Sequence, residues 1–173
     1  MTEQFDDKKI ITNSQPAGRI PVYFPSQPTI GASNLMKCIT IMQPFPYLIL
    51  RPDITDAAAR DQAAAQGYFK DIENRTWTTK YRGPLLIHSS KRPHPDIDLY
   101  REAMEEFGII IPLTRDLVYG QVVGQVTLSD VVDDCESFWF TGPYGLLLKD
   151  PMPFPVTTKA TGKLGLWEYQ MSK

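Results

Sequence analysis

Residues 67–92, GYFKDIENRTWTTKYRGPLLIHSSKR, hold the densest positive charge in this chain. We call this stretch the basic segment. Its six Lys or Arg residues stand against only Asp71 and Glu73, which gives a net charge of +4, whereas the whole chain carries −2. The basic residues are Lys70, Arg75, Lys80, Arg82, Lys91 and Arg92. Such a concentration in an acidic protein indicates a site for an anionic ligand more than a means of solubility.

The basic segment also predicts two β-strands joined by a turn. Residues 69–77 alternate in polarity, and an extended strand places three of their side chains on one face: Glu73, Arg75 and Trp77. The sequence YRGP at residues 81–84 is typical of a turn. Residues 85–90 then form an apolar strand that carries Leu86, His88 and Ser90 on one face. We expect the two strands to pair with each other.

The rest of the chain alternates short strands with helices. We expect further strands at residues 37–42, 119–132, 144–148 and 164–169, helices at residues 53–66 and 96–107, and irregular chain at residues 133–145 and 151–155. Thr55 or Asp56 can cap the first helix and Asp96 the second, while Gly67 and Gly108 can end them. Several strands without a repeated βαβ unit indicate an α+β domain built on a small β-barrel with flanking helices.

The N-terminal residues carry a different pattern. Prolines at positions 16, 21, 25 and 28, together with Gly18 and Gly31, interrupt any regular element. We therefore expect an irregular extension at residues 1–35, dispensable for folding, and one folded domain at residues 36–173.

Bulk composition narrows the class of protein. With 173 residues and 42% hydrophobic side chains, the chain is large enough to bury a core. It contains no signal-peptide pattern and no apolar run near the ~20 residues of a membrane span, so we expect a cytoplasmic protein without membrane contacts. Cys38 and Cys135 belong to no CxxC pattern and are expected to be buried and reduced.

Two groups of side chains allow competing interpretations. Lys70, Glu73 and Arg75 lie within six residues. Lys70 can act as a general base if burial lowers its pKa, and Arg75 can hold a phosphate. Spacing alone favours a surface ion pair that contributes less than ~1 kcal/mol. His88 similarly suits a proton shuttle or, more often for such a position, a hydrogen-bonded core residue.

Other chemistry finds little support in the sequence. HxH, HExxH and GxSxG patterns, Cys/His clusters and Gly-rich phosphate loops are absent, so we expect neither a metal nor a cofactor. Five aromatic side chains can stack on nucleobases, although most aromatics in a domain of this size belong to its core. They are Trp77, Tyr81, Trp139, Tyr144 and Trp167.

The chain resembles the ASCH family, a branch of the PUA-like barrels, over about residues 36–169. The resemblance is carried by Gln43-Pro44, KDIENRTW at 70–77, YRGPLLIH at 81–88, GQVVG at 120–124 and GLW at 165–167. The family signature is a glycine, a lysine two residues on, then a glutamate and an arginine. Lys70, Glu73 and Arg75 fit its charged positions, whereas Gly67 stands one residue too early and follows an Ala-rich segment that looks like an insertion.

The resemblance implies a cleft in a PUA-like barrel that acts on RNA or nucleosides. Family members include an amidohydrolase of N4-acetylcytidine, which has a threonine where this chain has Glu73, a reported ribonuclease and a domain of a transcription coactivator. We expect binding of RNA, single-stranded nucleic acid or a modified nucleoside. The alternatives are a hydrolase with Lys70 and Glu73 as catalytic pair, or a protein-interaction module. Expected ligand contacts are Gln43, Arg75, Trp77, Tyr81, Arg82, His88, Ser90 and Lys91. The oligomeric state stays open.

Overall fold

The computed structural model describes residues 35–171, which form a mixed α+β fold. The extension expected at residues 1–35 therefore lies outside the described residues except for Leu35, the first residue of β1. The elements are β1 (Leu35–Ile41), α1 (Phe45–Leu50), α2 (Ala57–Ala65), β2 (Ile72–Arg75), β3 (Gly83–Ser89), α3 (Ile97–Glu106), a short 3-10 helix (Thr114–Asp116), β4 (Gln121–Val132), β5 (Tyr144–Lys159) and β6 (Leu166–Gln170). None of these helices is both long and apolar enough to cross a membrane.

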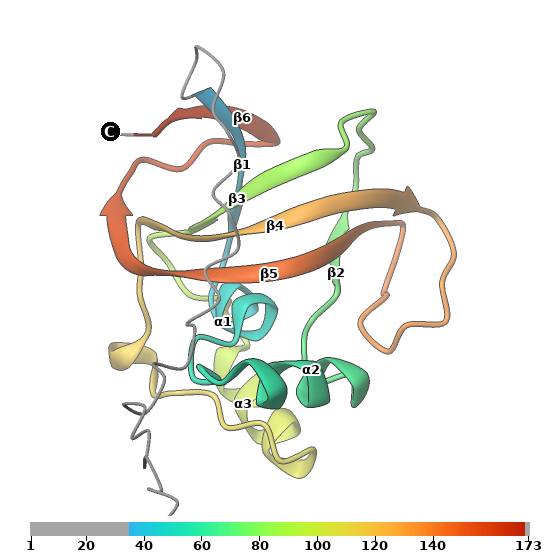
Figure 1. Ribbon diagram of the computed structural model, residues 1–173, viewed down its shortest axis with the longest axis vertical. Helices are drawn as coiled ribbons and strands as arrows, with labels where there is room; N and C mark the ends of the chain where they lie inside the picture. The colour runs from blue at the N-terminus through green and yellow to red at the C-terminus, as the bar shows by residue number, and fades with distance from the viewer. Residues whose placement is uncertain (1–34, 172–173) are drawn as a thin grey trace, which may run out of the picture. The chain divides into compact units, whose positions relative to one another are not determined.

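The strands of this region join in one six-stranded sheet with the order β2-β5-β4-β3-β1-β6. The β1–β3 pair is parallel, and the other neighbours are antiparallel. Figure 1 shows β4 and β5 as the long central pair, with the three α-helices gathered below the sheet and β6 at its opposite end. The helices therefore lie at one end of the sheet, where α1 contacts β3, β4 and β5.

The expected pairing of the two strands in the basic segment is wrong. β2 pairs with β5, where Glu73 lies opposite Leu146 and Arg75 opposite Tyr144. β3 lies instead between β4 and β1. Residues 85–89 of β3 are all buried, which suits a strand covered on both faces, whereas the short polar β2 suits a sheet edge. The burial of each strand decides which strands pair. The alternation of polar and apolar residues along one strand does not reveal that burial.

β5 differs from expectation in a second way. It continues as one strand through Pro151, Pro153 and Pro155, where irregular chain was expected. β2 covers the other side of β5 only as far as Leu147, so the later residues form a free edge on that side. Proline is tolerated there because a free edge does not require every backbone N–H as a donor. Register shifts between β4 and β5 absorb the remaining irregularity.

The helix caps are only partly as expected. Asp56 caps α2 by accepting a hydrogen bond from the Ala59 amide at 2.9 Å, and Gly67 follows in the left-handed conformation with φ +73. Asp96 precedes α3, but its side chain caps no amide. Cys38 is buried as expected, whereas Cys135 is only half-buried.

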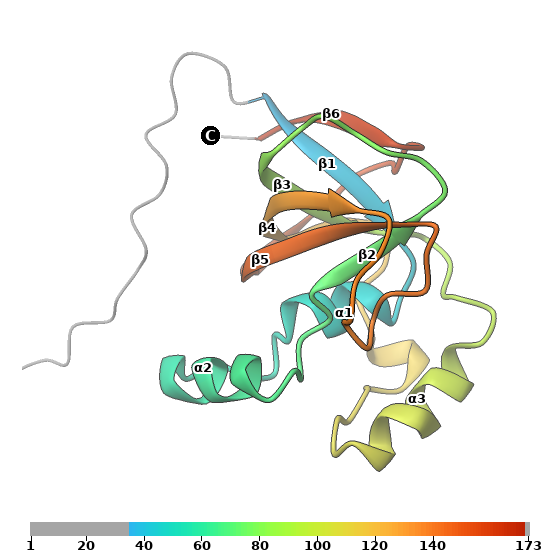
Figure 2. The same cartoon turned by 90° about the vertical axis from the view of Figure 1, so that its right-hand side faces the viewer.

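Edge strand β2 approaches β1, the strand next to the opposite edge strand β6. Arg75, on edge strand β2, donates a hydrogen bond to the carbonyl of Thr40 on β1 at 2.9 Å. Three strands separate β2 from β1 in the sheet order, so this contact requires the sheet to curl round (Figure 2). We call the line along which β2 meets β1 the seam. The candidate site lies beside it.

Candidate functional site

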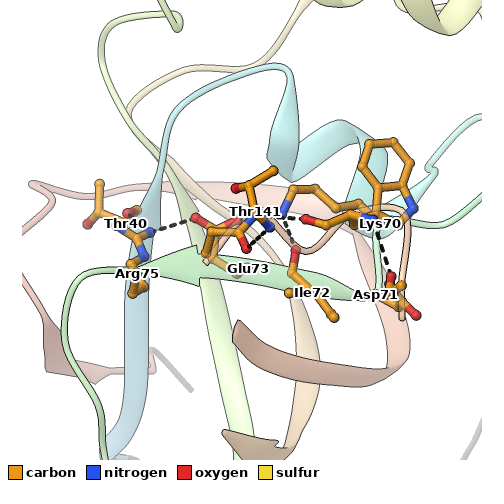
Figure 3. A network of polar contacts seen from close by, with 10 residues as sticks. Thr40, Lys70, Asp71, Ile72, Glu73, Arg75 and Thr141 are labelled. Atoms are coloured by element: carbon orange, nitrogen blue, oxygen red, sulfur yellow. Dashed lines mark hydrogen bonds and ion pairs between the residues drawn. The ribbon is translucent and has the colours of Figure 1, made fainter. Parts of the chain in front are cut away.

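A row of three charged side chains leads from the interior to the seam (Figure 3). Glu73 lies in the middle: its Oε2 is 3.0 Å from Lys70 Nζ, and its Oε1 is 3.0 Å from Arg75 Nη2. Lys70 and Glu73 are only 4% and 6% exposed. The expectation of a surface ion pair is therefore wrong, because both side chains are buried and Lys70 packs against α1.

Lys70 is held on several sides. Its ammonium group donates to the Ile72 carbonyl as well as to Glu73, and it lies 5.2 Å from the centroid of the Phe45 ring of α1. Its backbone amide donates to the Leu48 carbonyl at 3.0 Å. These contacts fix Lys70 as a buried cation whose charge Glu73 balances. The remaining positive charge of the row belongs to Arg75, which is partly exposed at the seam.

A pocket of about 690 Å³ opens beside the seam, and we call it the seam pocket. It is lined by Thr40, Arg75, Thr76, Trp77, His88, Ser90, Lys91, Thr161, Gly162, Lys163, Leu164 and Gly165. The lining contains three cationic side chains and no carboxylate. Five of the residues expected from the sequence thus meet here: Arg75, Trp77, His88, Ser90 and Lys91.

One wall of the seam pocket is a loop fitted tightly against β1 and β3. Thr40 Oγ1 accepts hydrogen bonds from the Lys163 amide at 3.2 Å and from Trp167 Nε1 at 3.1 Å. A Cβ atom on Gly162 would lie 2.7 Å from Thr40 Oγ1 and 2.8 Å from His88 Cε1. Only glycine fits this approach, so Gly162 determines where the flanking residues of the loop stand.

His88 anchors the same loop from β3. Its ring is 1% exposed, and Nε2 donates to the Ala160 carbonyl at 3.1 Å, which assigns the proton to that nitrogen. Burial lowers the pKa of His88, the nearby positive charge of Lys91 lowers it further, and the Ala160 hydrogen bond opposes both. His88 is therefore the buried, hydrogen-bonded residue that the sequence favoured, and it also lines the pocket, while its role as a proton shuttle stays a prediction.

Arg75 and Trp77 form the opposite wall. The Arg75 guanidinium carbon lies 6.0 Å from the centroid of the Trp77 ring. Arg75 Nε is buried and has no hydrogen-bond partner among residues 35–171. A cationic fork beside a half-buried indole offers a charge for an anion and a flat face for a ring.

The other expected site residues lie outside the seam pocket. Gln43 is buried and donates to the Val118 carbonyl at 2.9 Å, so its amide supports the fold. The Tyr81 ring packs on the main core, and Arg82 pairs with Asp130 at 2.7 Å on the surface. Lys70 and Glu73 lie behind Arg75 and do not line the pocket. Ser90, in contrast to these residues, does line the pocket, but its hydroxyl donates a hydrogen bond to the Arg92 carbonyl.

Sequence reasoning missed the loop that closes the pocket. Lys163 and Leu164 both line it, and Leu164 is 99% exposed. The available signal is the sequence TGKLG at residues 161–165, in which two glycines bracket a lysine. Glycines so placed indicate a loop shaped by close backbone approach, a feature common where backbones meet ligands.

Comparison with known proteins adds no family to this description: the chain matches neither a protein-family model nor a curated protein. Within residues 35–171, no group of three or more His, Cys, Asp or Glu side chains is placed to hold a metal ion. The cations and the aromatic surface of the seam pocket are thus the features of this region that suit a ligand.

Proposed function

We propose that this protein binds single-stranded RNA and that the seam pocket takes one of its nucleotide units. The observation that carries the proposal is the pocket lining, which combines the cations Arg75, Lys91 and Lys163 with the Trp77 ring and contains no carboxylate. Cations that follow a sugar–phosphate backbone, combined with aromatic faces for the bases, are the usual means of binding single strands.

The cations differ in what they contribute. Glu73 holds one edge of the Arg75 guanidinium, so this group is oriented before any ligand arrives. Arg75 therefore suits a directional contact to a phosphate or a base carbonyl. Lys91 and Lys163 are exposed side chains with flexible stems, which suit phosphate charges at variable positions. Trp77 and the exposed Leu164 supply apolar surface for a base.

We further propose that the domain is a PUA-like barrel of the ASCH type. The seam contact between Arg75 and Thr40 supports this proposal, since it brings β2 to β1 across the opening of a curled sheet. The covering of β3 on both faces also supports it: Leu85 and Ile87 belong to one buried cluster and Leu86 to another. The signature residues Lys70, Glu73 and Arg75 are joined by two ion pairs. Their contact supports the proposal because residues of one family signature are expected to act together.

Binding accounts for the geometry better than hydrolysis does. The Lys70 ammonium group already donates to a carboxylate and a carbonyl, and it does not line the seam pocket. Glu73 is bound by two cations and has no place in the pocket lining. Neither residue is placed to touch a ligand there. Their arrangement instead orients Arg75.

Fluorescence anisotropy with a labelled single-stranded RNA of about ten nucleotides tests the proposal. We expect affinity to fall as salt rises, with a slope near −2 for three phosphate contacts at about −0.7 each. Lys163→Ala should reduce the slope by about 0.7. Lys149→Ala is the matched control, because it removes an exposed lysine from β5 outside the pocket.

Two results would overturn this function. One is an absence of RNA binding at low salt; the other is binding that Lys163→Ala and Trp77→Ala both leave unchanged. Incubation of the same protein with N4-acetylcytidine, followed by chromatography, tests the hydrolase directly. Release of acetate that depends on Lys70 would replace the binding proposal with the hydrolase.

A further inference from the structure

A second hollow adjoins the seam pocket. It has a volume of about 540 Å³ and is lined by Lys91, Tyr119, Gly120, Lys159, Ala160 and Thr161. We call it the outer hollow. Lys91 and Thr161 line both depressions, so the two are neighbours with a common wall. The outer hollow also contains two lysines and no carboxylate in its lining.

The common wall is fixed to the sheet by hydrogen bonds. The Ala160 amide donates to the Gly120 carbonyl at 3.0 Å, and the Gly120 amide donates to the Ser89 carbonyl at 2.8 Å. From the other side, His88 Nε2 donates to the Ala160 carbonyl at 3.1 Å. Because β3 anchors both sides of this wall, the two depressions keep a constant relation to each other.

Gly120 places Lys91 at the boundary. Its φ is +63, a backbone conformation that favours glycine, and an added Cβ would lie 3.2 Å from Lys91 Cγ. The stem of Lys91 therefore runs closely over the backbone of residue 120 between the two depressions. Its ammonium group is available to a ligand that crosses from one to the other.

The outer hollow repeats the chemistry of the seam pocket in a simpler form. Lys159 supplies a further exposed cation, and Tyr119 supplies a half-buried ring. The Tyr119 hydroxyl donates to the Thr114 carbonyl at 3.0 Å, which holds the ring in place. A phosphate on Lys91 and Lys159, with a base or ribose against Tyr119, is the natural occupant.

We infer that the binding site spans at least two consecutive nucleotides, one in the seam pocket and the next in the outer hollow, with Lys91 at the connecting phosphate. This inference rests on the proposed RNA binding and narrows its ligand. A mononucleotide fills only the seam pocket, so the preferred ligand is a strand of two or more nucleotides. The chemistry of the outer hollow thus selects a polymer over a free nucleotide.

NMR titration of the full chain, labelled with ¹⁵N, tests this inference with two probes. Uridine 5′-monophosphate should shift the amide resonance of Gly162 in the seam pocket and leave that of Gly120 in place. The 5′-phosphorylated dinucleotide pUpU should shift both and bind about tenfold more tightly, the gain of a modest additional contact. Lys159→Ala should remove most of that gain and leave the mononucleotide affinity unchanged, whereas Lys149→Ala should change neither.

The outcomes separate this inference from the proposed function. If both probes bind equally and only Gly162 responds, the two-nucleotide site is wrong and the seam pocket remains the RNA site. The inference also fails if the mononucleotide shifts both glycines, or if Lys159→Ala leaves the dinucleotide gain intact. If neither probe nor a longer RNA shifts any amide in the wild-type protein, the proposed function fails as well.

Discussion

Two basic side chains of the basic segment, Lys70 and Arg82, each pair with a carboxylate, but the two ion pairs differ in their burial. Glu73 and Lys70 are buried at 6% and 4% exposure, whereas Arg82 and Asp130 pair on the surface. A buried charge that loses its partner stays out of water, so removing one member is costly. An exposed charge returns to water, and its pair contributes little. The two pairs therefore have different roles. Glu73 of the buried pair also orients Arg75, whereas the Arg82–Asp130 pair is an exposed surface contact.

The largest expected effect comes from breaking the buried pair. Glu73→Gln leaves the Lys70 ammonium buried without its carboxylate, so the free energy of unfolding should fall by about 3–5 kcal/mol. Urea denaturation followed by tryptophan fluorescence measures this loss. The double variant Lys70→Met, Glu73→Leu should recover part of it, because the buried Lys70 charge is removed together with its partner. A loss in Glu73→Gln no larger than that of an exposed pair would mean that burial does not set the energetic role of the Lys70–Glu73 pair.

A smaller effect is expected where the loop meets the seam. Gly162→Ala forces a Cβ to within 2.8 Å of Thr40 and His88, so the loop must move outward. Overpacking of this kind costs about 1–3 kcal/mol. RNA affinity should fall with stability, because Lys163 and Leu164 move with the loop. Melting curves and anisotropy on the same variant check both effects; unchanged values would mean that the loop is not fitted to β1 and β3.

Because His88 is buried, the free energy of unfolding is expected to depend on pH. Burial sets its pKa below the ordinary value of 6.5, so the unfolded chain takes up a proton before the folded protein does. The contribution of neutral His88 is therefore present above about pH 6.5 and is lost as the pH falls from there toward the lower folded pKa. Unfolding free energies of wild type and His88→Gln, measured between about pH 7 and 5, should converge on acidification. Parallel curves would contradict this role.

The smallest effect is expected at the surface pair. Arg82→Ala breaks the contact with Asp130 outside the seam pocket, so the melting temperature should not change measurably. RNA affinity should stay within about twofold of wild type, because only long-range charge is lost. Arg75→Ala, the matched change in the same segment, should weaken binding more than Arg82→Ala does. Equal losses would mean that the total charge of the segment, rather than the seam pocket, sets affinity.

Much of the local structure followed from the sequence. Alternation located β3 and β4, and Asp56 and Gly67 marked the ends of α2. These features depend on neighbours in the chain, so a single sequence contains them. The partner of β2 and the passage of β5 through three prolines did not follow, because each depends on which strand covers the other edge. Pairing across the chain is a tertiary property that local periodicity does not encode.

The sequence by itself determined that one short segment concentrates the positive charge and contains Arg75, Trp77, His88 and Lys91. Only the tertiary structure decided which charges are buried and which meet in a pocket. In the structure, Lys70 and Glu73 are buried behind Arg75, and Arg82 lies on the surface. Lys163, which is distant in the sequence, lines the seam pocket together with Arg75. The physical reason is that burial and proximity depend on the curl of the sheet, which brings β2 back to β1.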